Sequence, residues 1–207
     1  SLSCAPKFIV LQYIEFLFFA ALTLQLIYFL LFVIAFSKKA KASSSLSPVN
    51  GVPLSVVVCA HDELENLKIL IPELLQQHYP AFEVIVVDDR SNDETMNWLL
   101  TETKKHSKLR MVHVERTPDH INGKKYALTL GIRAASHDWI VLTDADCRPQ
   151  GLNWLSSLNE YAGNNTQIIL GYSPYQKKAG WLNRLIRFET FITGLQYLGF
   201  ALLKMPY

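Results

Sequence analysis

An uncharged apolar stretch near the start of the chain, Leu17 to Phe36, limits the possible folds more than any other feature of the sequence. It contains about 20 residues, the number that an α-helix needs to cross roughly 30 Å of hydrocarbon. Thr23 and Gln25 are its only polar breaks, so a buried core helix is the weaker alternative. We therefore predict a transmembrane helix over these residues.

Basic residues on either side of this stretch predict its orientation. Lys38, Lys39 and Lys41 follow it directly, whereas Lys7 is the one basic residue before it. Because positively charged flanks stay on the cytoplasmic side, we expect everything after residue 37 in the cytoplasm. No small-residue cleavage site follows the stretch, so we expect an anchor rather than a removed signal peptide.

The composition suggests one soluble domain behind this anchor. Lys and Arg number 20 against 18 Asp and Glu, a formal net charge of +2, so no strong field favours a nucleic-acid partner. Cys4, Cys59 and Cys147 lack the spacing of metal ligands, which fits a reduced cytosolic domain. We predict an anchor over residues 1–41, a Ser- and Pro-rich linker over 42–53 and a folded domain over 54–207.

The folded domain is predicted to be α/β. Helical periodicity at Leu64 to Gln77 and at Lys124 to Ala135 alternates with short apolar runs, which favours a mostly parallel, Rossmann-like sheet with flanking helices. Pro72 is expected to kink or end the first of these helices. The predicted strands are Leu54 to Cys59, Glu83 to Val87, Leu109 to Val114, Trp139 to Leu142 and Gln167 to Leu170.

Acidic residues follow three of the predicted strands. The first strand leads into Ala60-His61-Asp62-Glu63, the second into Asp88-Asp89, and a later one into Asp144-Ala145-Asp146. A single acid at such a place is usually a turn former or a helix cap. Three together indicate a ligand site, because ligands of open α/β sheets bind beyond the carboxyl ends of the strands.

Asp144 and Asp146 are the candidate metal ligands. Two carboxylates one residue apart at the mouth of a sheet can hold a hard cation, Mg²⁺ or Mn²⁺, and leave coordination positions for phosphate oxygens. Such a cation would neutralise the charge that develops on a departing diphosphate.

Two further residues suit a nucleotide. Because Ser91 or Asp93 can cap the next helix, one aspartate of the Asp88-Asp89 pair is free to accept a hydrogen bond from a base or a ribose. Lys124, near the start of a predicted helix, suits a diphosphate, although a solvated surface lysine is the alternative.

In this order, the motifs resemble those of glycosyltransferase family 2, whose catalytic domain has the GT-A fold. The resemblance runs from about Pro53 to the end of the chain and includes an Asp-Asp-X-Ser-X-Asp-X-Thr box and a Gly-Lys-X-X-Ala-Leu segment. The matching segments are Ser55 to Glu63, Asp88 to Thr95, Gly123 to Leu128 and Asp144 to Asp146. Asp62 stands where the family usually has Asn, and His61 where Arg or Tyr is more common.

The resemblance also implies roles for individual residues. Ala60, His61 and Glu63 would line the nucleotide pocket, Asp89 would contact the base, and Lys124 would lie near the phosphates. Asp144 and Asp146 would bind ribose, diphosphate and metal. The implied enzyme transfers a sugar from a UDP- or GDP-linked donor to a glycan or lipid-linked acceptor with inversion.

The family's general base is usually an aspartate in a Glu-Asp pair that follows the Asp-X-Asp strand at some distance. No such pair occurs up to Tyr207, and neither Glu160 nor Glu189 matches it. We therefore expect these 207 residues to bind the donor but to transfer little sugar on their own.

Trp181 to Lys204 is predicted to be an amphipathic helix, because Trp181, Leu185, Phe188 and Ile192 fall on one stripe. It fits a helix that lies on the membrane surface and helps to present the acceptor. A helix packed on the sheet fits almost as well.

Three other functions share part of this pattern. A nucleotidyltransferase should carry a glycine-rich basic loop after the first strand, where this chain has His61-Asp62-Glu63. A phosphatase of the haloacid dehalogenase type has its Asp-X-Asp on the first strand, whereas here the pair comes late. A non-catalytic, membrane-bound nucleotide-sugar-binding protein remains the third possibility.

Overall fold

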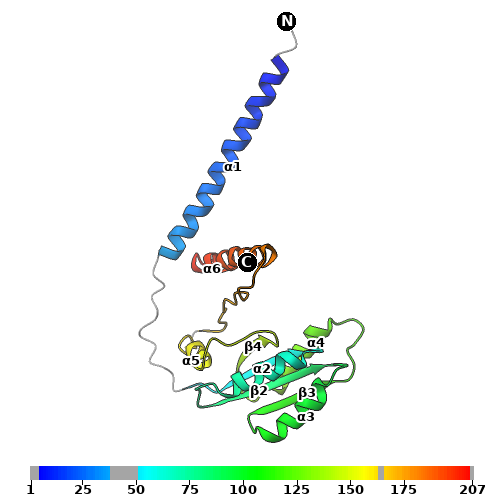
Figure 1. The fold of residues 1–207 in the computed structure, drawn as a ribbon. Coiled ribbons are helices and arrows are strands. Elements are labelled where there is room, and N and C mark those ends of the chain that lie inside the picture. The colour runs from blue at the N-terminus through cyan, green and yellow to red at the C-terminus, as the bar shows by residue number, and fades with distance from the viewer. Residues whose placement is uncertain (1–4, 38–50, 163–165, 206–207) are drawn as a thin grey trace. The chain divides into compact units, whose positions relative to one another are not determined.

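The computed structural model describes residues 5–37, 51–162 and 166–205. These residues form two compact units, which are described separately (Figure 1). One unit contains helix α1 and the residues from Tyr172 onward, and the other contains the sheet and ends at Gly171. Most of the predicted linker lies outside the described residues, and the predicted division into anchor, linker and domain stays a prediction.

The sheet unit has four parallel strands in the order β3-β2-β1-β4. The strands are β1 (Leu54–Ala60), β2 (Phe82–Asp89), β3 (Leu109–Val114) and β4 (Trp139–Asp144). The helices are α2 (Leu64–Leu75), α3 (Thr95–Lys105), α4 (Gly123–Ala134) and the short α5 (Trp154–Asn159). The predicted α/β class with a parallel sheet is therefore confirmed.

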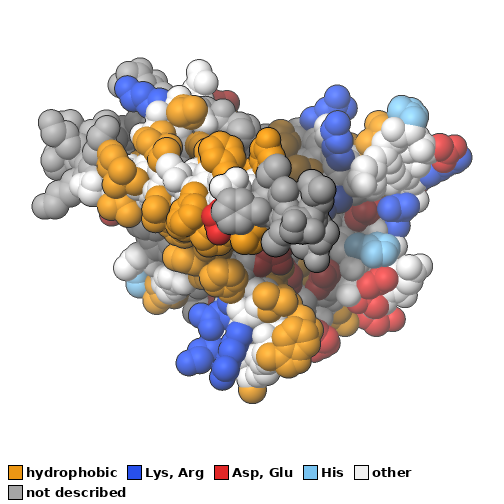
Figure 2. Space-filling view, turned by 90° about the horizontal axis from the view of Figure 1, so that it is seen from above, with side chains coloured by type: hydrophobic (Ala, Val, Ile, Leu, Met, Phe, Trp, Pro, Cys, Tyr) orange, Lys and Arg blue, Asp and Glu red, His pale blue; other side chains and the backbone are white. Residues whose placement is uncertain are grey.

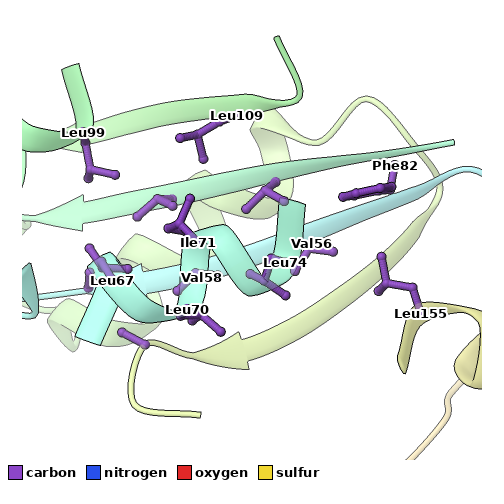
Figure 3. Packing of buried hydrophobic residues seen from close by; sticks show 14 of the residues in the cluster. Val56, Val58, Leu67, Leu70, Ile71, Leu74, Phe82, Leu99, Leu109 and Leu155 are labelled. Atoms are coloured by element: carbon purple, nitrogen blue, oxygen red, sulfur yellow. The ribbon is translucent and has the colours of Figure 1, made fainter. Parts of the chain in front are cut away.

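Apolar side chains on both faces of the sheet make this a three-layer arrangement. Val56, Val58 and Val84 face the cluster that contains Leu67 and Leu70 of α2 (Figure 3). The alternate residues of the same strands, such as Val57, Ile85 and Val87, face α4 instead. Because successive side chains of a strand point to opposite faces, continuous β-branched runs such as Leu54–Ala60 supply both cores.

Helix α4 approaches the sheet closely at Gly131. A Cβ atom built on Gly131 would lie 2.5 Å from Cγ1 of Val57 and 2.8 Å from Cγ2 of Val87. Such distances are far shorter than a van der Waals contact, so a side chain here would push the helix away from the strands. The glycine therefore sets the distance between α4 and the strands.

Glu83 lies in the amino half of β2, and its carboxylate is fully engaged. Ser55 Oγ donates to its Oε1 at 2.7 Å, the Ser136 backbone N–H donates to the same oxygen at 2.6 Å, and Arg110 Nη1 donates to Oε2 at 2.8 Å. Burial alone would raise the pKa of Glu83, but these hydrogen bonds outweigh it and lower the pKa from 4.5 to about 2.

One sequence-based expectation is wrong in this unit, and another is wrong in one of its two alternatives. Gln167 to Leu170 is not a strand: Ile168 and Leu170 are 77% and 62% exposed, and within the described chain no strand pairs with the outer edge of β4. A strand needs a neighbouring strand to which its backbone can hydrogen-bond, and an apolar run alone does not supply one. Pro72 does not end α2, which continues to Leu75, where the Gln76 N–H still donates to the Pro72 carbonyl.

The other unit contains two helices, α1 (Ala5–Ser37) and α6 (Trp181–Leu202), which pack together. The Phe32 ring meets Phe200 edge-on with centroids 5.5 Å apart, and Phe32 also fills the space beside Gly199, where an added Cβ would clash with it. Residues 10–37 are long and apolar enough to cross a membrane, by length and composition alone. Figure 2 shows many hydrophobic side chains gathered together at the surface. The flanking residues Lys38, Lys39 and Lys41 lie outside the described part.

Candidate functional site

The direction in which the chain crosses the sheet reverses between β1 and β4. From β1 the chain moves through α2 and α3 toward β3, and α4 then carries it back across the sheet to β4. Helices that leave two adjacent strands in opposite directions open a space beyond the strand ends, where ligands of such folds bind. Cys59 of β1 pairs in register with Asp144 of β4, so the predicted Asp-Ala-Asp segment begins beside this space.

Asp144 and Lys124 meet at this edge. Lys124 Nζ lies 2.9 Å from Asp144 Oδ1, and the two side chains are 69% and 56% exposed. The hydrogen bond and charge of Asp144 raise the pKa of Lys124, with a smaller contribution from Asp146. The structure thus brings Lys124, Asp144 and Asp146 close together, although they come from α4 and from the end of β4.

Asp89 ends β2 in the same cluster of strand ends, with its side chain 11% exposed. Arg90 Nε donates to its Oδ1 at 2.8 Å, and its Oδ2 would lie 3.2 Å from a Cβ added to Gly123. Asp89 therefore lies beside the first residue of α4.

Asp88 serves the structure instead. Its fully buried carboxylate accepts from the Ser91 N–H at 3.3 Å and lies 2.8 Å from His113 Nδ1. That one aspartate of this pair binds a ligand stays a prediction; of the two, Asp89 has an oxygen toward α4.

Cys59 lies among these groups, and sequence reasoning did not select it as a site residue. Burial raises the pKa of its thiol from 9.0 to about 11; Lys124 opposes this shift, whereas Asp144 and Asp89 add to it. Lys124, Asp144 and Asp89 therefore lie near enough to this thiol for their charges to affect its pKa. The apolar run of β1 gave no signal for this position, since a cysteine within a strand is usually core.

The loop after β1 is tied to the loop after β2. Asp62 has a φ of 55°, and its Oδ1 accepts from the backbone N–H of Asn92 at 2.6 Å and of Asp93 at 3.3 Å. His61 Nδ1 contacts the Asp89 carbonyl oxygen. The oxygen of an Asn side chain could accept the same two bonds, so the Asp in this chain preserves the loop connection.

Asp93 links the starts of two helices. Its Oδ1 accepts from the N–H of Thr95, the first residue of α3, at 3.0 Å, and its Oδ2 accepts from Leu64 N–H, the first residue of α2, at 3.4 Å. Asp93 thus satisfies backbone donors that have no partner within either helix. Of the two predicted capping residues, Asp93 makes the contact with α3.

Arg148 holds the loop after β4, and sequence reasoning missed it. It donates to the carbonyl oxygens of Cys147 at 2.7 Å and Ala145 at 3.1 Å, and its Nη2 donates to Asn66 Oδ1 at 2.9 Å. Asn66 in turn donates to Glu63 Oε2 at 2.6 Å. Arg148 and Asn66 are 82 residues apart, so no local pattern could reveal the contact. Glu63 is thereby connected to the loop that contains Asp144, Ala145 and Asp146.

Ala60, another predicted site residue, is the last residue of β1 and is buried.

The edge can hold a divalent cation only with help from a ligand. Among the described residues, no three His, Cys, Asp or Glu side chains converge as a metal site. Asp144 and Asp146 offer exposed hard oxygens, and Asp144 already holds a cationic group, the Lys124 ammonium. These donors fit Mg²⁺ or Mn²⁺ when diphosphate oxygens and water complete the coordination.

Comparisons with known proteins show what this chain is similar to. The sequence model described as "Glycosyl transferase family 2" matches residues 55–204. Chondroitin synthase of Pasteurella multocida is 30% identical over 67% of this chain and 14% of its own length. A poly-beta-1,6-N-acetyl-D-glucosamine synthase of Staphylococcus epidermidis is 29% identical over 54% of this chain and 25% of its own length. The chain therefore spans about a quarter or less of these relatives.

A solved structure supports the fold. The mannosyltransferase of Pyrobaculum calidifontis, in complex with GDP-Man and Mn²⁺, is 22% identical and has a TM-score of 0.52. The match covers 70% of this chain and 44% of that one. The predicted GT-A architecture is therefore confirmed at the level of the fold.

Proposed function

The chain belongs to glycosyltransferase family 2, and from this premise we propose that the carboxyl edge of its sheet binds a UDP- or GDP-linked sugar with Mg²⁺ or Mn²⁺. The observation that carries the proposal is the 2.9 Å contact between Lys124 Nζ and Asp144 Oδ1, with Asp89 beside the first residue of the same helix α4 and Asp146 two residues beyond Asp144. They come from three segments of the chain, and together they offer acceptors for a nucleoside, a cation for phosphate and carboxylates for a metal.

In this proposal Asp89 selects the nucleoside. Its carboxylate can accept from a base N–H or a ribose hydroxyl through the oxygen that faces α4. Arg90 keeps the carboxylate oriented through the 2.8 Å bond to its other oxygen. Ala60 ends β1, and His61 and Glu63 belong to the loop that follows it, whose position Asp62 fixes against the turn after β2.

Lys124 is proposed to change partner when the donor binds. Its side chain is exposed and starts from the first turn of α4, so its ammonium can leave Asp144 for a diphosphate oxygen. Asp144 and Asp146 are then free to hold the cation. A bound divalent cation would neutralise charge on the leaving diphosphate.

The intact protein is proposed to transfer the sugar with inversion to a glycan or lipid-linked acceptor. A deprotonated acceptor hydroxyl would attack the anomeric carbon in line, and the nucleoside diphosphate would leave from the opposite side. No general base is assigned within residues 1–207. The named relatives are synthases of polysaccharides, which supports a glycan acceptor.

Titration calorimetry with UDP and GDP, with and without Mn²⁺, tests the donor site. We expect one nucleotide to bind with an affinity that Mn²⁺ raises, and Asp146→Asn to weaken the Mn²⁺-dependent binding about 30-fold or more, roughly 2 kcal/mol. Asp138→Asn is the matched control, because Asp138 precedes the same strand at its other end.

Three results would contradict the proposal. Absence of nucleotide binding would favour a scaffold, and equal binding by Asp146→Asn and the unchanged chain would remove the metal site. Phosphate release from a simple phosphomonoester, without base recognition, would instead favour a phosphatase.

We also propose that α1 anchors the chain in a membrane, with the sheet unit in the cytoplasm. The apolar residues of α1 and the lysines after residue 37 support this orientation. In right-side-out vesicles, a membrane-impermeant maleimide should label Cys4, and Cys147 only after permeabilisation. Cys4→Ser should abolish labelling of the sealed vesicles. Labelling of Cys147 in sealed vesicles would reverse the orientation.

A further inference from the structure

Arg90 lies between the Asp89 carboxylate and the first residue of α4. Its Nε donates to Asp89 Oδ1 at 2.8 Å. Its Nη2 would lie 2.8 Å from a Cβ added to Gly123, and Asp89 Oδ2 would lie 3.2 Å from the same point. The guanidinium therefore reaches past one carboxylate oxygen to the start of α4, where the second carboxylate oxygen also lies.

The backbone of Arg90 has a conformation that arginine rarely adopts. Its φ is 58°, in the left-handed region that favours glycine. The residues on either side are fixed: the Ser91 N–H donates to Asp88 Oδ1 at 3.3 Å, and the Asp89 carbonyl oxygen contacts His61 Nδ1. An arginine side chain at so constrained a position points to a function for that side chain.

The two carboxylate oxygens of Asp89 are unequal. Oδ1 accepts from Arg90, whereas Oδ2 accepts no hydrogen bond from the residues that the structure describes. The Asp89 side chain is 11% exposed and that of Arg90 is 43% exposed. Oδ2 is thus left as an acceptor for a ligand, and Arg90 Nη2, close to the same point on α4, is left as a donor.

One acceptor close to one donor matches a base that presents a carbonyl group next to a single ring N–H. Uracil has such an edge, because its N3–H lies between two carbonyl oxygens. Guanine adds a second donor, the N2 amino group, directly beside its N1–H. A carboxylate satisfies both guanine donors only when both of its oxygens can accept.

Arg90 removes this possibility for guanine. Its Nε already occupies Asp89 Oδ1, so a second donor of the base would meet a cationic group there. The guanine amino group would lose its hydrogen bond to water without gaining one on Asp89, which weakens binding. Uracil avoids this loss, because it presents only one N–H to the carboxylate.

We propose that Arg90 is a specificity-determining residue that makes the donor site select uracil over guanine, so that the donor is a UDP-linked sugar. Arg90 does this by occupying Asp89 Oδ1 and by donating from Nη2 to a carbonyl oxygen of the base. The inference rests on the proposed function, since it concerns the base that Asp89 binds there.

Titration calorimetry of the full chain in detergent micelles with Mn²⁺ tests the inference with UDP, GDP and IDP. IDP carries hypoxanthine, which is guanine without the N2 amino group, so GDP and IDP differ only in the second donor. We expect UDP to bind at least about tenfold more tightly than GDP, because the guanine amino group stays unpaired. For the same reason IDP should bind about threefold or more tightly than GDP.

Arg90→Gly should change this order. Glycine suits a φ of 58° and leaves Asp89 Oδ1 open, so GDP should now bind more tightly than IDP. The preference for UDP over GDP should shrink about tenfold. Arg133→Ala is the control, because Arg133 is an exposed arginine in the last turn of α4, at the opposite end from Gly123. It should keep the order of the unchanged chain.

The three nucleotides on the unchanged chain decide the outcome even if Arg90→Gly does not fold. GDP that binds as tightly as UDP, or more tightly than IDP, would overturn the inference and leave the donor site standing. So would a folded Arg90→Gly that weakens all three nucleotides alike, since that is the result of a purely structural role. Absence of binding by all three would reject the inference and the proposed function together.

Discussion

The two ends of the parallel sheet use the same residue types for opposite purposes. At the amino end, Glu83 is 8% exposed and its two carboxylate oxygens accept from Ser55, Ser136 and Arg110. At the carboxyl end, the Asp144 carboxylate pairs with the Lys124 ammonium, and both side chains are more than half exposed. Burial and the number of donors therefore decide whether an acid stabilises the fold or stays available to a ligand.

The energies of the two ends differ accordingly. A buried carboxylate with several donors is costly to disturb, because its loss removes the acceptor of the Ser55 hydroxyl and of the Ser136 N–H and breaks the ion pair with Arg110. An exposed ion pair contributes only about 0 to 1 kcal/mol to stability, so the Asp144–Lys124 pair can open at little cost. This difference predicts which substitutions change stability and which change binding.

Glu83→Gln should give the largest loss of stability. We expect the free energy of unfolding to fall by about 3 kcal/mol, because a buried, hydrogen-bonded charge is removed from Arg110. Urea unfolding followed by circular dichroism measures the change. Glu65→Gln is the matched control: Glu65 forms a surface pair with Lys68 at 2.7 Å and should contribute less than about 1 kcal/mol. Equal effects of the two substitutions would contradict the comparison.

The same carboxylate should make stability depend on pH. The pKa of Glu83 is lowered in the fold from 4.5 to about 2, so its contribution is complete above pH 4.5 and is lost as the pH falls from there toward 2. The stability difference between the unchanged chain and Glu83→Gln should therefore be constant between about pH 5 and 7 and shrink below that range. A difference that stays constant down to about pH 3 would show that Glu83 is not held as a buried anion.

Gly131→Ala should lower both the stability of the sheet unit and its affinity for a nucleotide, because it displaces α4. Its Cβ would clash with Val57 and Val87, so we expect a loss of about 1 to 2 kcal/mol in spite of the better helix propensity of Ala. Because α4 carries Lys124, nucleotide affinity should fall as well. Gly171→Ala is the control, since nothing lies within 4 Å of its Cβ position. Thermal unfolding of both variants gives the comparison, and a stabilised Gly131→Ala would refute the close packing.

Lys124→Met should have the smallest effect on stability and a measurable one on binding. Loss of its exposed pair with Asp144 should change the free energy of unfolding by less than about 0.5 kcal/mol. UDP or GDP affinity should fall about tenfold, roughly 1.4 kcal/mol, if the ammonium passes to the diphosphate. Lys125→Met is the neighbouring control. If calorimetry finds the same nucleotide affinity for Lys124→Met and Lys125→Met, Lys124 is a solvated surface lysine and does not bind the diphosphate.

The sequence allowed the sheet to be predicted better than its surroundings. Strands β1 to β4 were located by their β-branched runs, and α2 and α4 by apolar residues every three or four positions. Residues 167–170 were misassigned, because an apolar run does not reveal whether a neighbouring strand is available to it. The short α5 was missed, since six residues are too few for a helical period to show.

The site followed the same division. Asp89, Asp144 and Asp146 were predicted because parallel strands place their ends at one edge, and Lys124 because it opens a helix; their roles in binding stay predictions. Contacts such as Arg148 with Asn66 join segments 82 residues apart, so they become visible only when the chain is folded. The division of labour between Asp88 and Asp89 likewise depends on His113 from another strand.

The central claim is that carboxylates at the end of β4 and a nucleoside diphosphate together hold one divalent cation. Electron–nuclear double resonance on Mn²⁺ in the presence of the full chain and UDP or GDP tests it most directly. We predict a ³¹P coupling to chain-bound Mn²⁺ that disappears in Asp146→Asn and persists in Asp138→Asn. A chain-bound Mn²⁺ signal that is identical in both variants, or that lacks phosphorus coupling, would contradict the account.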